Sequence, residues 1–187
     1  MRSDLRVIKT KQALEEALLI LLQEKALKSI SITEICRLAK INRGTFYLHY
    51  GQIEDLFEDY YKEIMKDLTD SYQEPYRHTK ILNPRELNPS TIRIFHHIEK
   101  YKRFYRIVFS KTVPMSYYYL LFDQVRDLLR KDMNLALKPE IDFAMLSAYQ
   151  ANAILGMAIE WSRTDFRQKA EELNQQLVYI LNINLAN

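Results

Sequence analysis

The sequence predicts an all-α protein of about nine helices, with a small N-terminal three-helix domain over residues 1–50 and a larger helical domain over residues 51–187. Three observations favour this fold class. Only 3 Gly and 5 Pro stand among 187 residues, no long alternating run of β-branched residues is present, and the apolar positions recur at helical spacing. Hydrophobic residues make up 48% of the chain. A chain of this length and composition can bury a substantial core.

The first predicted helix covers about residues 5–24. Its apolar residues share one face at helical spacing, and they are Leu14, Ala17, Leu18, Leu21 and Leu22. We expect this face to form the third side of the small N-terminal core.

Residues 31–50 contain two short helices, each with its own start signal. Ser31 and Glu34 form an S-x-x-E capping box, in which each side chain satisfies a backbone N–H of the other residue. Asn42 is a suitable N-cap for a second helix that begins at Arg43. The second helix is too polar at its start to belong only to a core. Such a pair is typical of a helix-turn-helix, which places its second helix in the major groove of DNA.

The same stretch resembles the DNA-binding domain of the TetR/AcrR family of bacterial transcriptional regulators. The matching segments are S-I-T-E-I-C-R-L-A, the recognition helix N-R-G-T-F-Y-L-H-Y, and E-D-L-F at the start of the next helix. This resemblance covers the first quarter to third of the chain. Farther on, the segment A-I-L-G-M-A-I-E-W around Trp161 is similar to part of one C-terminal subgroup of the family.

The resemblance implies DNA contacts for the residues of this motif. At the start of the recognition helix, Arg43 and Gly44 stand where the family contacts base edges, and Arg43 suits a bidentate hold on guanine. Tyr47 is expected against a thymine methyl or a phosphate, while Phe46 and Tyr50 are expected to pack inside. The complete expected set is Ser31, Lys40, Asn42, Arg43, Gly44, Thr45, Tyr47 and His49.

Three positions depart from the family's pattern. Lys40 occupies the turn position where the family usually has Gly, and a left-handed backbone there would cost a non-Gly residue about 1–2 kcal/mol. Leu48 replaces a commonly polar residue, and Ile53 replaces a phosphate-binding Lys. Gly51 and Gln52 could still offer N–H groups to phosphate. We therefore expect the family's binding mode with a different set of backbone contacts.

Positive charge is concentrated in the first 50 residues, which hold 9 Lys and Arg against 5 Asp and Glu, whereas the other 137 residues hold 18 against 19. Phosphate binding requires such a local excess. Four basic residues precede or open the first helix. They either reach phosphates or the minor groove, or form a solvated basic end, and they are Arg2, Arg6, Lys9 and Lys11.

The single Cys36 excludes an intrachain disulfide and suits a reducing compartment. No segment is apolar enough for a signal peptide or a membrane span, so we expect a cytoplasmic protein. No catalytic motif is present, and adjacent His96 and His97 cannot form an i,i+4 metal pair on a helix. The sequence thus predicts a protein that is not an enzyme and has neither a metal site nor a cofactor.

A long fourth helix is expected over about residues 52–72, where it would contact both domains and transmit motion between them. Residues 74–90 contain three Pro and read as a linker or irregular loop. The remaining helices are expected at about residues 90–100, 102–110, 114–135, 139–163 and 166–184.

The last two predicted helices have broad apolar faces rich in small residues. An antiparallel pair meeting its twofold mate would form a four-helix bundle, and the family resemblance implies the same dimer. An intramolecular bundle is the alternative. The expected interface residues are Ala148, Ala151, Ile154, Leu173 and Leu177.

The larger domain is rich in aromatic residues, which either form its core or line an effector pocket of the kind the resemblance implies. The candidate pocket residues are Phe95, Phe104, Tyr105, Phe109, Tyr118, Phe122, Tyr149 and Trp161.

Together these patterns predict a DNA-binding transcriptional regulator. We expect a repressor that binds a palindromic double-stranded operator as a homodimer and responds to a small apolar or aromatic effector. In one alternative, the larger domain binds a protein partner or only dimerises, without a small-molecule effector. The more remote alternative is a small helical enzyme that uses His96 or His97.

Overall fold

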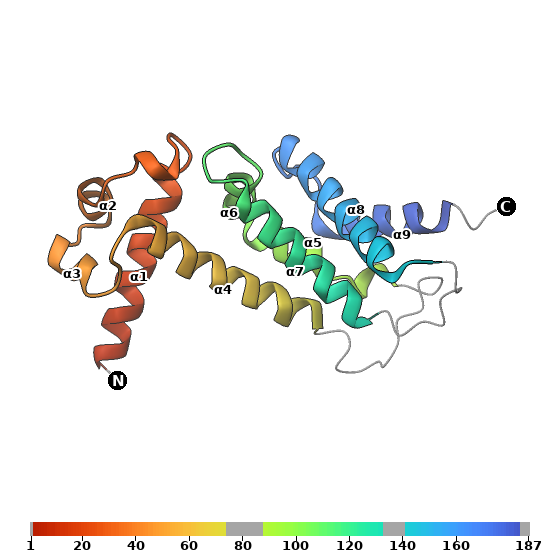
Figure 1. Cartoon of the computed structure of the whole chain (residues 1–187), viewed down its shortest axis with the longest axis horizontal. Coiled ribbons are helices and arrows are strands. Elements are labelled where there is room, and N and C mark those ends of the chain that lie inside the picture. Colours follow the sequence, from red (N-terminus) through yellow and green to blue (C-terminus); the bar gives the residue numbers. More distant parts are fainter. Residues whose placement is uncertain (1, 74–87, 133–140, 184–187) are drawn as a thin grey trace.

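The computed structural model describes residues 2–73, 88–132 and 141–183, and the regular elements of these residues are all helical, which confirms the predicted all-α class (Figure 1). The α-helices are α1 (Arg2–Leu21), α2 (Ile32–Ala39), α3 (Arg43–Tyr47), α4 (Ile53–Gln73), α5 (Ile94–Lys100), α6 (Lys102–Val108), α7 (Ser116–Asp132), α8 (Phe143–Arg163) and α9 (Ala170–Ile183). Two short 3₁₀ turns, η1 (Leu27–Ser29) and η4 (Pro89–Thr91), complete the order.

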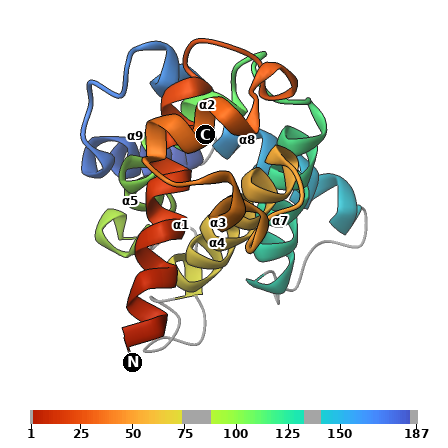
Figure 2. The same cartoon turned by 90° about the vertical axis from the view of Figure 1, so that its left-hand side faces the viewer.

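Helices α1, α2 and α3 form one end of the molecule, and α4 runs from them toward the other helices (Figure 1). Leu14 and Leu18 of α1, Ile35 of α2 and Phe46 of α3 are completely buried in this end. Figure 2 turns this end toward the viewer, and α1 packs against both α2 and α4. The predicted apolar face of the first helix therefore closes the three-helix core.

The α4 helix contacts α1 as well as α5 and α7. Its buried side chains follow one face and include Leu56, Phe57, Ile64 and Leu68, which are fully shielded from solvent. Because one continuous helix enters both groups of helices, the division at residues 50 and 51 remains a prediction.

Beyond α4, α7 packs on α8 and α5 packs on α9. The starts of α5, α8 and α9 each lie about four residues after the starts expected from the sequence, and two of these differences have a local cause. Asp142 caps α8 by accepting hydrogen bonds from the N–H groups of Ala144 at 2.7 Å and Met145 at 3.0 Å, so this helix begins after Asp142. The α9 helix begins at Ala170 rather than near Phe166, because Asp165 and Phe166 have φ angles of 59° and 54° and cannot continue a right-handed helix.

Most of the predicted linker, residues 74–87, lies outside the described residues. Its last part is described, and the Asn88 side chain caps η4 by accepting a hydrogen bond from Ser90 N–H at 2.9 Å.

Carboxylates gather where α1 meets α4. Glu15 of α1 is partly buried, and this burial, together with the charges of Glu63 and Asp59 on α4, raises the pKa of Glu15 to about 7. Lys11 opposes this shift and lies 2.7 Å from Asp59, which also accepts a hydrogen bond from the Tyr50 hydroxyl at 2.9 Å. The contact between α1 and α4 therefore favours the neutral form of Glu15.

Replacing Glu15 with Gln should change how stability depends on pH. The folded protein holds the Glu15 proton up to a pH of about 7, whereas an ordinary Glu releases it near 4.5, so the free energy of unfolding should fall as pH rises across this window. Glu15→Gln keeps the side chain neutral and should flatten that fall. Urea unfolding at several pH values measures the difference, with the exposed Glu172→Gln as a control that keeps the wild-type slope. Parallel slopes for wild type and Glu15→Gln would contradict this assignment.

Lys40 has a left-handed backbone, with φ 55° and ψ 43°, at the end of α2. A residue with a Cβ is strained there, while Gly is not, although Gly loses more backbone entropy on folding. Lys40→Gly should therefore raise the free energy of unfolding by up to about 1 kcal/mol. Lys40→Ala removes the charge and keeps the strain, so it separates the two effects in chemical denaturation. Equal stabilities of the Gly and Ala variants would refute the strain argument.

Candidate nucleic-acid interface

The start of α2 is fixed by the predicted capping box. Glu34 N–H donates to Ser31 Oγ at 3.3 Å, and Ser31 N–H donates to Glu34 Oε2 at 3.0 Å. Lys25 pairs with the same carboxylate, and these hydrogen bonds, that of Lys25 first, lower the pKa of Glu34 to about 2. The Ser31 hydroxyl remains exposed but also donates to Glu34 at 2.8 Å, so any phosphate would share this hydroxyl with the cap.

The turn from α2 to α3 depends on the left-handed Lys40. This geometry lets Ile41 N–H donate to Cys36 O at 2.9 Å, which closes the end of α2. The Lys40 side chain is exposed. Asn42 then caps α3, as predicted, by accepting a hydrogen bond from Thr45 N–H at 2.7 Å.

Phe46 and Tyr50 anchor α3, since both are buried as predicted. Arg43, Gly44 and Tyr47 are exposed, whereas Thr45 and His49 are half-buried. The structure therefore brings the expected base-contacting side chains to the outer side of one short helix whose inner side is held by aromatic packing.

Arg43 and Tyr47 lie one helical turn apart and contact each other. Arg43 Nη2 donates to the Tyr47 hydroxyl at 3.2 Å, and the guanidinium carbon lies 5.9 Å from the centre of the Tyr47 ring. This contact orients the guanidinium group of an otherwise exposed side chain.

Gly44 leaves the backbone of α3 open to approach. A Cβ built there would meet Asn42 Oδ1 at 3.4 Å, which is an ordinary van der Waals distance. Packing inside the chain therefore does not require Gly at this position, whereas close approach by another molecule would be helped by it.

The start of α4 differs from the expectation for phosphate binding. Ile53 is buried, and Asp55 Oδ2 accepts hydrogen bonds from Gly51 N–H at 3.0 Å and Gln52 N–H at 3.1 Å. The Gln52 amide also donates to Asp55 Oδ1 at 2.9 Å. The Asp55 carboxylate thus caps α4 and occupies these donors within the chain, a role that an Asp three residues after Gln52 could have signalled.

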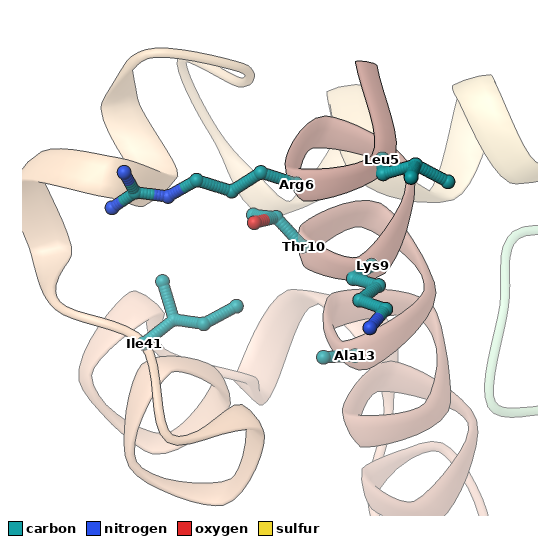
Figure 3. A pocket seen from close by; sticks show the side chains of 6 residues that line it. All are labelled: Leu5, Arg6, Lys9, Thr10, Ala13 and Ile41. Atoms are coloured by element: carbon teal, nitrogen blue, oxygen red, sulfur yellow. The ribbon is translucent and has the colours of Figure 1, made fainter. Parts of the chain in front are cut away.

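A groove of about 380 Å³ separates α1 from the turn between α2 and α3. Figure 3 shows Arg6 extending away from α1 beside this groove and Ile41 pointing into it from the turn. Lys9 and Thr10 also line the groove. Lys11, in contrast, is paired with Asp59 at 2.7 Å, and the side chain of Arg2 lies outside the described part of the chain.

The candidate effector residues take different positions in the larger group of helices. Phe95 and Trp161 are buried with ring centres 6.1 Å apart, and Phe104 and Tyr105 are buried with centres 5.4 Å apart. Phe109, Tyr118 and Phe122 are half-buried, whereas Tyr149 is 71% exposed on α8. Most of these rings thus belong to the core, and Tyr149 belongs to the outer surface.

A polar cluster crosses from α4 to α5 beside these rings. His97 Nδ1 lies 2.8 Å from Asp67 Oδ2, and Lys100 Nζ donates to Asp67 Oδ1 at 2.6 Å. Burial lowers the pKa of His97 to about 4, so His97 is neutral near pH 7, and we assign its proton to Nδ1 because this atom faces the carboxylate. Its Nε2 atom and the hydroxyl of Tyr105 are buried without a hydrogen-bond partner among the described residues.

Four of the five expected dimer residues face inward. Ala151, Ile154, Leu173 and Leu177 are buried within the single chain, and Ala148 is half-buried. Exposed apolar residues of the same two helices are not in that set, because an apolar stripe does not reveal whether its cover comes from the same chain. The exposed residues include Met145, Tyr149 and Gly156 of α8 and Tyr179, Ile180 and Ile183 of α9.

The described residues contain no group of three or more His, Cys, Asp and Glu side chains suited to a metal ion. His96 lies 3.3 Å from Asn174 Nδ2, away from the Asp67 partner of His97. Among the helices that the structure describes, none combines the length and the apolar character needed to cross a membrane.

Two family models match the chain. Residues 14–60 match "Bacterial regulatory proteins, tetR family", and residues 85–183 match "Transcriptional regulator C-terminal region". A curated relative is YxbF of Bacillus subtilis (strain 168), described as an uncharacterized HTH-type transcriptional regulator. It is 22% identical over 163 residues, which are 87% of this chain, and the match spans only 42% of the length of the relative.

Solved structures share the fold. The fatty acid degradation regulator FadR from Bacillus halodurans aligns with a TM-score of 0.71 and 14% identity, over 95% of this chain and 97% of FadR. NalD, the secondary repressor of the MexAB-OprM multidrug efflux pump in Pseudomonas aeruginosa, aligns with a TM-score of 0.69 and 19% identity, over 94% and 95% of the two chains. The dihydroxyacetone kinase operon activator DhaS aligns with a TM-score of 0.63 and 20% identity, over 92% of this chain and 93% of DhaS.

These relatives are transcription factors rather than enzymes. With both family models matched in order along one all-helical chain, the protein belongs to the TetR family of DNA-binding bacterial transcriptional regulators.

Proposed function

We propose that the protein is a cytoplasmic, ligand-responsive repressor that binds a palindromic operator as a homodimer. The observation that carries this proposal is the outer side of α3, where Arg43, Gly44 and Tyr47 are exposed on a helix held by buried Phe46. The N-terminal end of a recognition helix is the part that meets base edges in the major groove. Repression follows where the occupied operator overlaps a promoter.

Around α3, the expected phosphate contacts come from Thr45, His49 and the exposed Lys40, with the shared hydroxyl of Ser31 at the start of α2. Arg6 and Lys9 beside the groove of Figure 3 add two cations next to the turn. Asn42 contributes by capping α3, because its side chain oxygen is already used by Thr45 N–H.

We assign dimerisation to the outer face of α8 and α9. Met145 and Tyr149 of α8 are 72% and 71% exposed, and Ile183 of α9 is 68% exposed. Pairing this face with a second copy would remove apolar surface from water and would set the distance between two recognition helices. The buried Ala151, Ile154, Leu173 and Leu177 would then support the interface from beneath.

For the effector, we propose a small apolar or aromatic molecule with one polar group, bound between α5 and α6 after side chains rearrange. In support, His97 Nε2 can accept a hydrogen bond and the Tyr105 hydroxyl can donate one, and both lie among aromatic rings. Through His97 and Asp67, such a molecule would act directly on α4.

The second candidate keeps DNA binding without a small-molecule effector, so that the larger group of helices binds a protein or only dimerises. It is favoured by one observation, namely that Phe95, Phe104, Tyr105 and Trp161 are already buried by their neighbours.

Substituting Arg43 tests the proposed operator contact. We expect Arg43→Ala to weaken binding to DNA from upstream of its own gene by about 1–3 kcal/mol and to relax the preference at one base pair. Electrophoretic mobility shift at several salt concentrations measures both effects. The exposed Arg167→Ala, placed before α9, is the matched control and should bind like wild type. Absence of any sequence-selective, salt-dependent shift by the wild type would sink the proposal.

A charge at Gly156 tests the dimer face. A Cβ at this position of α8 would meet no atom within 4 Å in the single chain, so the fold should tolerate a larger residue. Gly156→Glu should yield a folded monomer in sedimentation velocity experiments, because the new carboxylate would be buried against the partner. Gln12→Glu adds the same charge on exposed α1 and should remain a dimer. A dimeric Gly156→Glu variant would exclude this face.

A further inference from the structure

Leu48 is the most exposed large hydrophobic side chain among the described residues, at 81%. It directly follows α3 and keeps a helical backbone, with φ −70° and ψ −19°. Its N–H donates to Gly44 O at 3.2 Å, and Tyr50 N–H donates to Phe46 O at 3.0 Å. The backbone position of Leu48 is therefore held by these hydrogen bonds and by the buried rings on either side of it in the sequence, Phe46 and Tyr50.

The outer side of α3 consists of two neighbouring rows. Residues four apart lie on the same helix face, so Arg43 and Tyr47 form one row, and Gly44 and Leu48 form the other. The first row is polar and internally paired through the 3.2 Å hydrogen bond. The second row is apolar, and because Gly44 has no side chain, nothing in this row stands in front of Leu48.

In the major groove, one apolar group marks the identity of a base pair, namely the C5-methyl group of thymine. An apolar row beside a polar row on one recognition helix matches a groove edge in which a thymine methyl lies near a hydrogen-bonding base. Because the Gly44 and Leu48 row is continuous with the residues that carry the proposed operator contact, DNA is the occupant that the geometry favours for it.

We infer that Leu48 is a specificity-determining residue that packs against a thymine methyl in each half of the operator. This inference rests on the proposed operator binding. The family commonly has a polar residue at this position. Leu48 would lose that residue's contact to the DNA backbone and would gain a role in sequence preference. The backbone of Gly44 allows the base edge to come close, while Arg43 and Tyr47 read or position the neighbouring base pair.

Removing the methyl group from the DNA tests this contact directly. An operator is first selected with wild-type protein from a pool of randomised duplexes. Each thymine is then replaced by deoxyuridine, together with its symmetry mate, and dissociation constants are measured for wild type and Leu48→Ala. Losing one buried methyl group should raise the dissociation constant roughly fourfold for each half-site. We therefore expect the wild type to lose about tenfold or more in affinity at one symmetric pair of thymines.

Leu48→Ala should bind the unmodified operator more weakly than wild type and should no longer distinguish thymine from deoxyuridine at that pair. Leu120→Ala removes an exposed apolar side chain from α7 and should keep the full discrimination. Circular dichroism of both variants confirms that the helices remain folded.

Two results would overturn the inference, and they differ in what else they reject. If every deoxyuridine substitution affects wild type and Leu48→Ala equally, Leu48 reads no methyl, while operator binding itself stands. If the wild type selects no sequence from the pool, the proposed operator function fails as well.

Discussion

The packing of α4 is the constraint on which the other features depend. Phe57 of this helix is fully buried, with its ring centre 4.6 Å from that of Tyr117 on α7 and 6.4 Å from that of Phe104 on α6. Four residues earlier, Ile53 is buried at the end that follows α3. One continuous helix thus joins the aromatic packing around Phe57 to the end that follows α3.

Polar contacts supplement this apolar packing at both ends of α4. Lys11 of α1 pairs with Asp59 of α4 at 2.7 Å. Beside this contact, α6 is joined to α1, because Arg103 donates to both carboxylate oxygens of Glu16 at 2.8 Å. At the far end, Asp67 joins His97 and Lys100 of α5. These bonds are partly exposed, and each contributes little stability. In neutral His97, Nδ1–H faces Asp67 of α4 and Nε2 is a buried acceptor. An effector that donates a hydrogen bond to Nε2 would therefore be linked to α4 through His97 alone.

Features set by neighbouring residues could be predicted from the sequence, and those set by distant packing could not. The caps at Ser31 and Asn42 use partners three residues away, so their pattern was sufficient. The start of α9 was harder to place, because Asp165 and Phe166 take left-handed backbones in a loop where Asp165 pairs with Arg106 of α6. The donors at the start of α4 were overestimated, since the cap by Asp55 was not recognised.

The faces of α8 and α9 illustrate the same limit. Both helices have apolar residues on more than one side. The stripe that is rich in small residues suggested a dimer interface. In the structure this stripe covers the core of its own chain, while larger side chains such as Met145 and Tyr149 remain exposed. Helical periodicity finds apolar faces but does not say which of two such faces the rest of the chain will cover.

The outer side of α3 presents a polar row and an apolar row beside an α4 start whose donors are already occupied. Ile53 is buried and the N–H groups before α4 are held by Asp55, so this end supplies less to the phosphates than a lysine would. A smaller number of phosphate contacts reduces the salt-dependent, sequence-independent part of the affinity. A larger share of discrimination then depends on base contacts. The oriented guanidinium of Arg43 suits a polar base edge, and exposed Leu48 suits an apolar one, so the two rows together can supply complementary parts of a single readout.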